Sequence, residues 1–333
     1  MTPTLSSVWP EVSAASARLG VLRIGGAPID PPSADLFERW LARGHHGTMS
    51  YLAKNAAVRR NPTGRFPWAK SVIMILVPYE SERSSEPGVL SSAIARYALG
   101  DDYHIVLDGM LVELEGTISR LVPEAQTRRY VDTGPLSDRA YAAAAGLGWI
   151  GKNGMLIDPD HGSYFFIGTL LTSLRHDLNA EEITDRCGTC RHCIEACPTD
   201  AIAMDRTIDS TRCISYATIE HRGPLPVEVR DKLSGNVFGC DICQEVCPWN
   251  HTPAAPHPSF RLRESYRNRP VSDLLQMKQA DFSSLFSKSA VKRAKRSGMV
   301  RNALTILSDT VTPPELSVET DEGIRDALQR GKR

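Results

Sequence analysis

The cysteines constrain this chain more than any other feature of its sequence. All eight lie between Cys187 and Cys247, and none occurs elsewhere in the 333 residues. Disulfide frameworks belong mostly to small secreted domains with cysteines spread throughout. A dense block inside a longer chain without a signal peptide is instead typical of a metal site. The sequence therefore predicts a segment that is organised around bound metal.

The spacing of the cysteines indicates which metal. The first motif, Cys187-x2-Cys190-x2-Cys193-x3-Cys197-Pro198, has the bacterial ferredoxin spacing, in which three thiolates hold one 4Fe–4S cluster and the fourth crosses to another. The second motif is Cys240-x2-Cys243-x3-Cys247-Pro248, and Cys213 is the remaining thiol that can complete it. Crossing over in the ferredoxin manner predicts two ligand sets. They are Cys187, Cys190, Cys193 and Cys247 for one cluster, and Cys197, Cys213, Cys240 and Cys243 for the other.

Two structural zinc sites are the alternative, since paired CxxC units also suit tetrahedral zinc. Zinc motifs rarely place a third cysteine shortly after a CxxC pair, and two motifs of one zinc protein rarely both end in CxxxCP. We therefore expect two clusters close enough to pass electrons between them. The residues ahead of the cysteines must then contain the site that receives those electrons.

Length and composition allow a multi-domain protein. The chain is 41% hydrophobic, its 39 basic residues equal its 39 acidic ones, and no apolar run is long enough for a membrane span. We expect a soluble cytoplasmic protein in three parts: a catalytic domain over residues 1–180, a two-cluster domain over 181–255 and a helical region over 256–333.

The first part alternates between strand and helix patterns, which predicts an α/β layer domain. Strands are expected at Val72–Tyr79, Arg129–Val131 and Tyr164–Leu171, and helices at Ala34–Arg43 and Ile105–Leu121. Residues 253–258 resemble a linker. The helical tail that follows is too short for a large core of its own. Its inner faces are expected to hold Leu274, Leu275, Met277, Phe282, Leu285, Phe286, Val291, Val300, Leu304 and Leu307.

No GxGxxG motif follows a strand and opens a helix, and no GxxxxGK[ST] motif is present, so the usual dinucleotide and nucleotide cradles are unsupported. The segments 130–139 and 146–153 are distinctive instead, because they combine an acid at a strand end with glycines that let backbone approach a ligand. Together with other segments, they make the chain resemble the epoxyqueuosine reductase family over nearly its whole length. The resemblance is carried by Arg96–His104, Val131–Pro135, Gly146–Lys152, both cysteine motifs, Cys213–Glu220 and Cys247–Asn250.

This resemblance implies an α/β cobalamin-binding domain, a ferredoxin-like domain with two 4Fe–4S clusters and a short helical region similar to HEAT repeats. It implies base-off cobalamin that the clusters reduce to cob(I)alamin. The implied reaction converts epoxyqueuosine to queuosine at the wobble position of a tRNA anticodon, the final step of queuosine biosynthesis. A flavodoxin or ferredoxin would donate the electrons, and a monomer is expected.

Opening the epoxide places negative charge on the departing oxygen, which a positioned acid must protonate. The resemblance makes Asp132 that acid. A carboxylic acid at its usual pKa of about 3.9 is ionised at neutral pH, so burial beside the corrin should raise the pKa of Asp132. From residue type alone, a turn or cap aspartate before Thr133 and Gly134 is the alternative.

Position in the family motifs also implies a set of cobalamin contacts. The alternative for Arg59 and Lys152 is a solvated surface charge, and for Tyr97 it is a core aromatic ring. The expected contacts are Arg59, Tyr97, Asp132, Lys152, Asn153, Leu156, Ser215 and Asp241.

A basic stretch near the C-terminus is the candidate tRNA contact. No acidic residue occurs between Asp281 and Asp309, and on a helix several of the positive charges would share one face. A solvated helix face is the alternative. The expected contacts are Lys288, Lys292, Arg293, Lys295, Arg296 and Arg301.

The chain also departs from the family pattern. Its helical region is shorter than in many members, and Asp138 stands where glutamate is expected. Two rival functions remain open from sequence. One is a reductive dehalogenase-like small-molecule reductase, and the other is an electron-transfer ferredoxin without catalytic activity.

Overall fold

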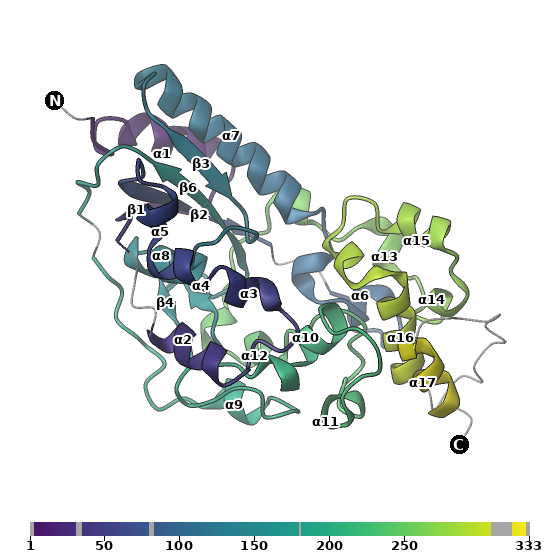
Figure 1. The fold of residues 1–333 in the computed structure, drawn as a ribbon. Coiled ribbons are helices and arrows are strands. Elements are labelled where there is room, and N and C mark those ends of the chain that lie inside the picture. The colour runs from purple at the N-terminus through teal and green to yellow at the C-terminus, as the bar shows by residue number, and fades with distance from the viewer. Residues whose placement is uncertain (1–2, 31–34, 80–82, 180, 308–321, 331–333) are drawn as a thin grey trace.

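A four-stranded sheet forms the centre of the N-terminal part of the computed structural model (Figure 1). The structure describes residues 3–30, 35–79, 83–179, 181–307 and 322–330. The strands are β1 (Arg23–Pro28), β2 (Ser71–Pro78), β3 (Thr127–Tyr130) and β6 (Phe165–Thr172). Their order is β1-β2-β6-β3, and every pair of neighbours is antiparallel.

Strand β2 is buried along its whole length because both faces of the sheet are covered. Ile73, Ile75 and Val77 point into a core shared with α1 (Trp9–Arg18) and α7 (Tyr103–Leu121). Val72, Met74 and Leu76 alternate with them and point into the opposite core, which α8 (Asp138–Ala144) covers. A strand between two apolar layers therefore appears in the sequence as a continuous apolar run.

The expected elements of this part are confirmed. Strands β2, β3 and β6 and helices α2 (Asp35–Ala42) and α7 coincide with the predicted segments to within a few residues. The layered architecture is also present. Alternating strands and helices usually build a parallel sheet. This sheet is antiparallel, because the connections between paired strands bring the chain back in the opposite direction.

The cysteine segment contains only short helices, which suits a region organised around metal. Residues 253–258, the expected linker, contain no helix or strand before η4 begins at Pro258. The helices of the segment are α9 (His192–Glu195), η2 (Ser210–Arg212), α10 (Ile214–Ile219), α11 (Val227–Arg230), α12 (Ile242–Glu245) and η3 (Pro248–Asn250). A hairpin of β4 (Trp149–Ile150) and β5 (Leu156–Ile157) packs against it through Trp149, Ile157 and Cys247.

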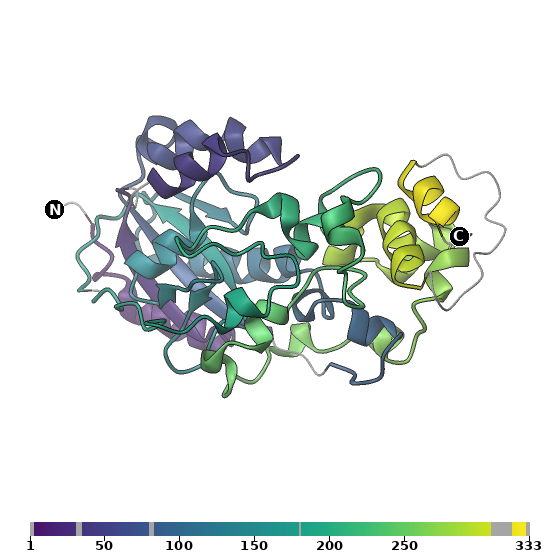
Figure 2. The ribbon, with the colours of Figure 1, turned by 90° about the horizontal axis from the view of Figure 1, so that it is seen from below.

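The C-terminal helices lie at the opposite end of the molecule from the sheet (Figure 2). They share one core with Leu90, Ile94 and Phe238 from earlier in the chain, so the tail has no large core of its own, as expected. All ten predicted inner-face residues belong to this core or pack against it. The helices of this core are α13 (Glu264–Arg267), α14 (Asp273–Gln276), α15 (Gln279–Leu285), η5 (Ala290–Ala294), α16 (Lys295–Leu307) and α17 (Glu322–Arg330). The preceding turn, η4 (Pro258–Phe260), packs through Phe260 in the core of the sheet instead.

Short helices also connect the sheet to the rest of the molecule. They are α3 (Ser50–Lys54), α4 (Ala56–Arg60), α5 (Pro62–Arg65), α6 (Leu90–Ala93) and η1 (Arg96–Ala98). Throughout the described part of the chain, no helix is both long enough and apolar enough to cross a membrane.

Candidate cluster and cofactor site

The eight thiols gather into two groups. The thiol of Cys193 interacts with those of Cys187, Cys190 and Cys247, whereas the thiol of Cys240 interacts with those of Cys197 and Cys213. Cys243 lies with Cys213 and Cys240 and also interacts with Cys193 of the other group. The structure thus brings the cysteines together in the two sets that the spacing predicts, and the sets adjoin.

Each group suits a cluster by its chemistry. Burial, together with the neighbouring thiols, raises the pKa of Cys240 to about 12 and also raises the pKa of Cys213 and Cys247. Four such thiols can become thiolates only when a bound cation compensates their charge. Backbone N–H groups add support, and the amide of Ala201 donates to the Cys197 sulfur at 3.4 Å.

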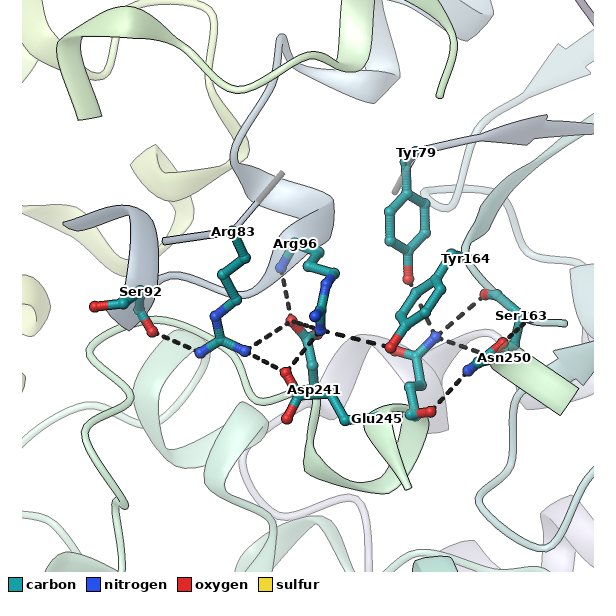
Figure 3. Close-up of polar contacts among 10 residues, drawn as sticks. Tyr79, Arg83, Ser92, Arg96, Ser163, Tyr164, Asp241, Glu245 and Asn250 are labelled. Atoms are coloured by element: carbon teal, nitrogen blue, oxygen red, sulfur yellow. Dashed lines mark hydrogen bonds and ion pairs between the residues drawn. The ribbon is translucent and has the colours of Figure 1, made fainter. Parts of the chain in front are cut away.

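Amide side chains connect the second cysteine motif to the sheet domain (Figure 3). Gln244, on α12, donates from Nε2 to the Ser163 hydroxyl at 3.1 Å and to the Tyr79 hydroxyl at 3.2 Å. Asn250 accepts from the backbone nitrogen of Ser163 at 2.7 Å. These bonds hold the second motif against the ends of β2 and β6.

Asp241 is a buried carboxylate within that motif, only 2% exposed. It accepts from the backbone nitrogen of Arg96 at 2.7 Å and lies 3.7 Å from the guanidinium of Arg83 and 3.9 Å from that of Arg96 (Figure 3). Both arginines also pair with Glu245, at 2.5 and 2.6 Å. Burial raises the pKa of Asp241. The carboxylate, an expected cobalamin contact, thus binds protein groups and links the second motif to η1.

Asp132 follows β3 in a left-handed backbone conformation, with φ of 57°, which aspartate tolerates better than most residues. Its carboxylate accepts a hydrogen bond from the Tyr103 hydroxyl at 2.8 Å, and His104 Nε2 lies 4.0 Å away. The Asp132 side chain is 69% exposed. The protein alone therefore does not provide the burial that the sequence analysis expects for this acid.

Groups from several elements surround Asp132. Its charge acts on Arg59 of α4, Tyr97 of η1 and Tyr51 of α3. Arg59 donates from Nη1 to the carbonyl oxygen of Leu136. Its Nε is buried and has no hydrogen-bond partner among the described residues, so a bound group carrying phosphate or amide oxygens would satisfy it. Asp132, Arg59 and Tyr97 thus lie near one another, and their contact with cobalamin stays a prediction.

Lys152 and Asn153 face the cysteine loops instead. The ammonium group of Lys152, only 7% exposed, donates to the carbonyl oxygens of Gly188 at 2.7 Å and Cys190 at 2.8 Å. Asn153 donates to the carbonyl oxygen of Cys243 at 3.3 Å. The surface-charge alternative for Lys152 is wrong, and its amine has protein partners already.

The remaining two expected cobalamin contacts are Leu156 and Ser215. Leu156 is buried in the core against α8, and Ser215 is half-buried in the first turn of α10. The backbone N–H groups of Ser215 and Tyr216 bond to the Cys213 thiol and lower its pKa in opposition to burial.

The basic stretch does not form one continuous helix face. Lys288 precedes η5, and Lys295 interrupts the path between η5 and α16 with φ of 62°, so the expected helical alignment is wrong. Lys288, Lys292 and Lys295 are exposed. Arg293 is also exposed but pairs with Glu220 at 2.8 Å, and Arg296 donates to the carbonyl oxygen of Met277 at 2.6 Å.

Arg301 does not lie on the surface. It is 2% exposed and donates to the carbonyl oxygens of Ala217 at 2.8 Å, Gly223 at 2.9 Å and His221 at 3.0 Å. Its charge is used inside the protein, where it joins α16 to α10 and to the segment that follows α10. The prediction of a tRNA contact at Arg301 is therefore wrong in this structure.

Tyr103 and His104 are the neighbours of Asp132 that sequence reasoning missed. Both belong to the Arg96–His104 segment that carries the family resemblance, but no role was derived for them. Arg83 and Glu245, which complete the buried ion pairs at Asp241, were missed as well, since nothing in their local sequence marks them.

Comparisons with known proteins agree on one family. Two family models match: "4Fe-4S double cluster binding domain" over residues 186–250, and "Epoxyqueuosine reductase QueG, DUF1730" over residues 59–133. Epoxyqueuosine reductase of Synechocystis sp. is 40% identical over 289 residues, which is 84% of this chain and 98% of that protein. The one from Leadbetterella byssophila is 40% identical over 295 residues, covering 88% and 96%.

Solved structures agree with these relatives. A crystal structure of epoxyqueuosine reductase with a tRNA-Tyr epoxyqueuosine-modified tRNA stem loop is similar, with a TM-score of 0.83 at 29% identity. The match covers 92% of this chain and 82% of that one. The structure of epoxyqueuosine reductase from Streptococcus thermophilus has a TM-score of 0.80 at 30% identity and covers 91% and 81%.

Proposed function

Because the chain belongs to the epoxyqueuosine reductase family, we propose that it reduces epoxyqueuosine to queuosine in tRNA, at the wobble position of the anticodon. This is the final step of queuosine biosynthesis. The observation that carries the proposal is the pair of adjoining four-thiol groups next to a site that presents the Asp132 carboxylate. The relative that was solved with a modified tRNA stem loop supports the choice of substrate.

The protein holds two 4Fe–4S clusters and uses cobalamin. The thiol groups would hold the clusters, and Arg59, Tyr97, Asp132, Asn153 and Ser215 would contact cobalamin. When bound, these cofactors supply electrons one at a time and a strongly reducing cobalt centre. We assign cobalamin binding and catalysis to residues 1–180, the clusters to 181–255 and tRNA contacts to 256–333.

Asp132 is the proposed catalytic acid. Breaking a carbon–oxygen bond of the epoxide leaves negative charge on oxygen, and a carboxylic acid beside it lowers the barrier by giving up its proton. The Tyr103 hydroxyl, 2.8 Å from the carboxylate, orients the acid. The open side of Asp132, whose side chain is 69% exposed, is where cobalamin and the modified base would bind.

The exposed lysines Lys288, Lys292 and Lys295 are the proposed contacts to tRNA phosphates. Arg293 and Arg296 would lose existing protein contacts to join them. The modified base must leave the stack of the anticodon to reach Asp132, as single-stranded loop bases readily do. We further propose a cytoplasmic monomer that receives electrons from a flavodoxin or a ferredoxin.

The proposal can be tested against its rivals with protein purified without oxygen. Optical and EPR spectra should show cobalamin together with 4Fe–4S clusters, since the two have separate signatures. Protein that carries clusters but fails to bind added cobalamin would instead be an electron carrier. Reduction of a halogenated phenol, without reduction of an epoxyqueuosine-containing stem loop, would identify a dehalogenase-like reductase.

A further inference from the structure

The N-terminus of α7 places a histidine between two carboxylates, one of which is Asp132. His104 Nε2 lies 4.0 Å from Asp132, and Nδ1 of the same ring lies 2.8 Å from Asp102. The His104 side chain is 37% exposed and that of Asp102 is 22% exposed. Asp102, His104 and Asp132 thus form a row of ionisable groups with the catalytic acid at one end.

Local structure holds the imidazole in this position. Asp102 caps α7 by accepting from the backbone nitrogen of His104 at 3.1 Å, with the same oxygen that contacts Nδ1. The Tyr103 ring stacks on the His104 ring with centroids 4.1 Å apart, and its other neighbour is Phe166 at 4.4 Å. The Tyr103 hydroxyl at the end of this stack bonds to Asp132.

The contacts of the His104 ring fix which of its nitrogens faces Asp132. The hydrogen bond from His104, helped by the positive charge of Arg263, lowers the pKa of Asp102, so this carboxylate is ionised and accepts Nδ1–H at neutral pH. Arg263 itself pairs with Asp101 at 2.8 Å. With Nδ1–H held by Asp102, a second proton on the ring resides on Nε2 and faces Asp132.

We propose that His104 returns a proton to Asp132 within each turnover and that Asp102 is the positioning residue that holds the His104 ring. The inference rests on the proposed function. Converting an epoxide to an alkene breaks both bonds to its oxygen, takes up two electrons and two protons, and releases water. The cofactors supply the electrons, but Asp132 carries one proton at a time.

The sequence of proton transfers follows from this balance. Asp132 gives its proton to the oxygen as the first carbon–oxygen bond breaks. His104 then passes its Nε2 proton to the Asp132 carboxylate, which delivers it to the oxygen as the second bond breaks, and solvent restores the proton on His104. The 4.0 Å between His104 Nε2 and the Asp132 carboxylate must shorten, or one water must bridge it, before a proton can pass. Catalytic hydrogen bonds often tighten in this way only when the substrate complex forms.

One test measures the coupling without catalysis. In full-length protein with both clusters and 15N-labelled histidine, NMR spectra should show that Asp102→Asn and Asp132→Asn each shift the ring nitrogen resonances of His104, because each variant changes a carboxylate neighbour of that ring. Asparagine still caps a helix and tolerates positive φ, so both variants should fold. His161→Gln is the matched control, because His161 pairs with Asp158 at 3.1 Å outside this site. Unchanged His104 ring resonances in both variants would overturn the relay.

The second test uses the stem loop. His104→Gln should lower kcat by about tenfold or more while KM stays within about twofold, with normal iron and cobalamin content. Wild-type kcat should depend on pH, because one proton of each turnover comes from solvent through His104, and His104→Gln should weaken that dependence. His161→Gln should match wild type in both. Equal kcat in wild type and His104→Gln would exclude the relay alone, whereas a wild type that cannot convert the stem loop would exclude the proposed function.

Discussion

The ammonium group of Lys152 donates a 2.8 Å hydrogen bond to the carbonyl oxygen of Cys190, inside the first cysteine motif. A second bond of 2.7 Å reaches Gly188. Lys152 therefore anchors the loop that carries the first three cysteines, although the sequence predicts a cobalamin contact.

Lys152→Met should weaken this anchor, because two carbonyl oxygens lose their partner at a cost of about 1–3 kcal/mol. We expect faster release of iron to a chelator, with cobalamin affinity unchanged. Lys54→Met, at an exposed lysine on α3, is the control. Weaker cobalamin binding with normal iron retention would instead support the cobalamin contact that the sequence predicts for Lys152.

Tyr103→Phe should reduce turnover without disturbing the fold. The ring stacks on Phe166 at 4.4 Å with an interplanar angle of 7°, and phenylalanine keeps that contact but loses the hydrogen bond to Asp132. Loss of this hydrogen bond should raise the activation free energy by about 1–1.5 kcal/mol, which corresponds to roughly a tenfold lower kcat. Tyr141→Phe removes a buried hydroxyl that bonds to Ile29 away from the site, and it should keep the wild-type rate. Equal rates for both variants would exclude the orienting role.

Asp138→Asn should raise thermal stability above pH 6. Burial raises the pKa of Asp138 to about 6 from its ordinary 3.8, so the folded state binds this proton more tightly than the unfolded state does. The protonated carboxyl of Asp138 therefore contributes to the free energy of unfolding. This contribution is fully present below pH 3.8 and is lost as pH rises through 6.

The asparagine avoids the buried charge and can still accept from the Thr169 hydroxyl, which lies 2.7 Å from Asp138. The gain should be no more than about 3 kcal/mol at pH 8 and close to zero below pH 4. Thermal denaturation at both pH values measures it. A Tm difference that does not depend on pH would show that Asp138 titrates normally.

Charge reversal at Lys292 and Lys295 should weaken stem-loop binding and reduce its salt dependence, because fewer counterions are released. Activity on the free nucleoside should stay unchanged. Reversal of Arg18 and Arg120, two exposed cations on α1 and α7, is a control with the same change in net charge. If both double variants bind the stem loop like wild type, the C-terminal lysines are not its contact.

Sequence reasoning succeeded where spacing or periodicity determines structure. The cysteine intervals placed eight thiols into two sets, and the apolar run of β2 identified a strand covered on both faces. It failed where a long charged side chain is buried by distant segments. Arg301 and Lys152 resemble surface cations in a linear sequence, yet both bond to carbonyl oxygens contributed by other parts of the chain.

The catalytic site could be predicted only in part for the same reason. Asp132 was found through the family motif, but its contacts with Tyr103 and His104 depend on how α7 packs against the end of β3. The direction of the strands was also undetermined, because alternation of elements does not specify the path of their connections.

The most direct test of the account compares wild type with Asp132→Asn, each reconstituted with iron, sulfide and cobalamin, on an epoxyqueuosine-containing anticodon stem loop. Mass spectrometry of the digested RNA should show loss of one oxygen atom from the modified nucleoside with wild type only. EPR should show the same cofactors in both proteins. No conversion by fully loaded wild type, or equal conversion by Asp132→Asn, would contradict the account.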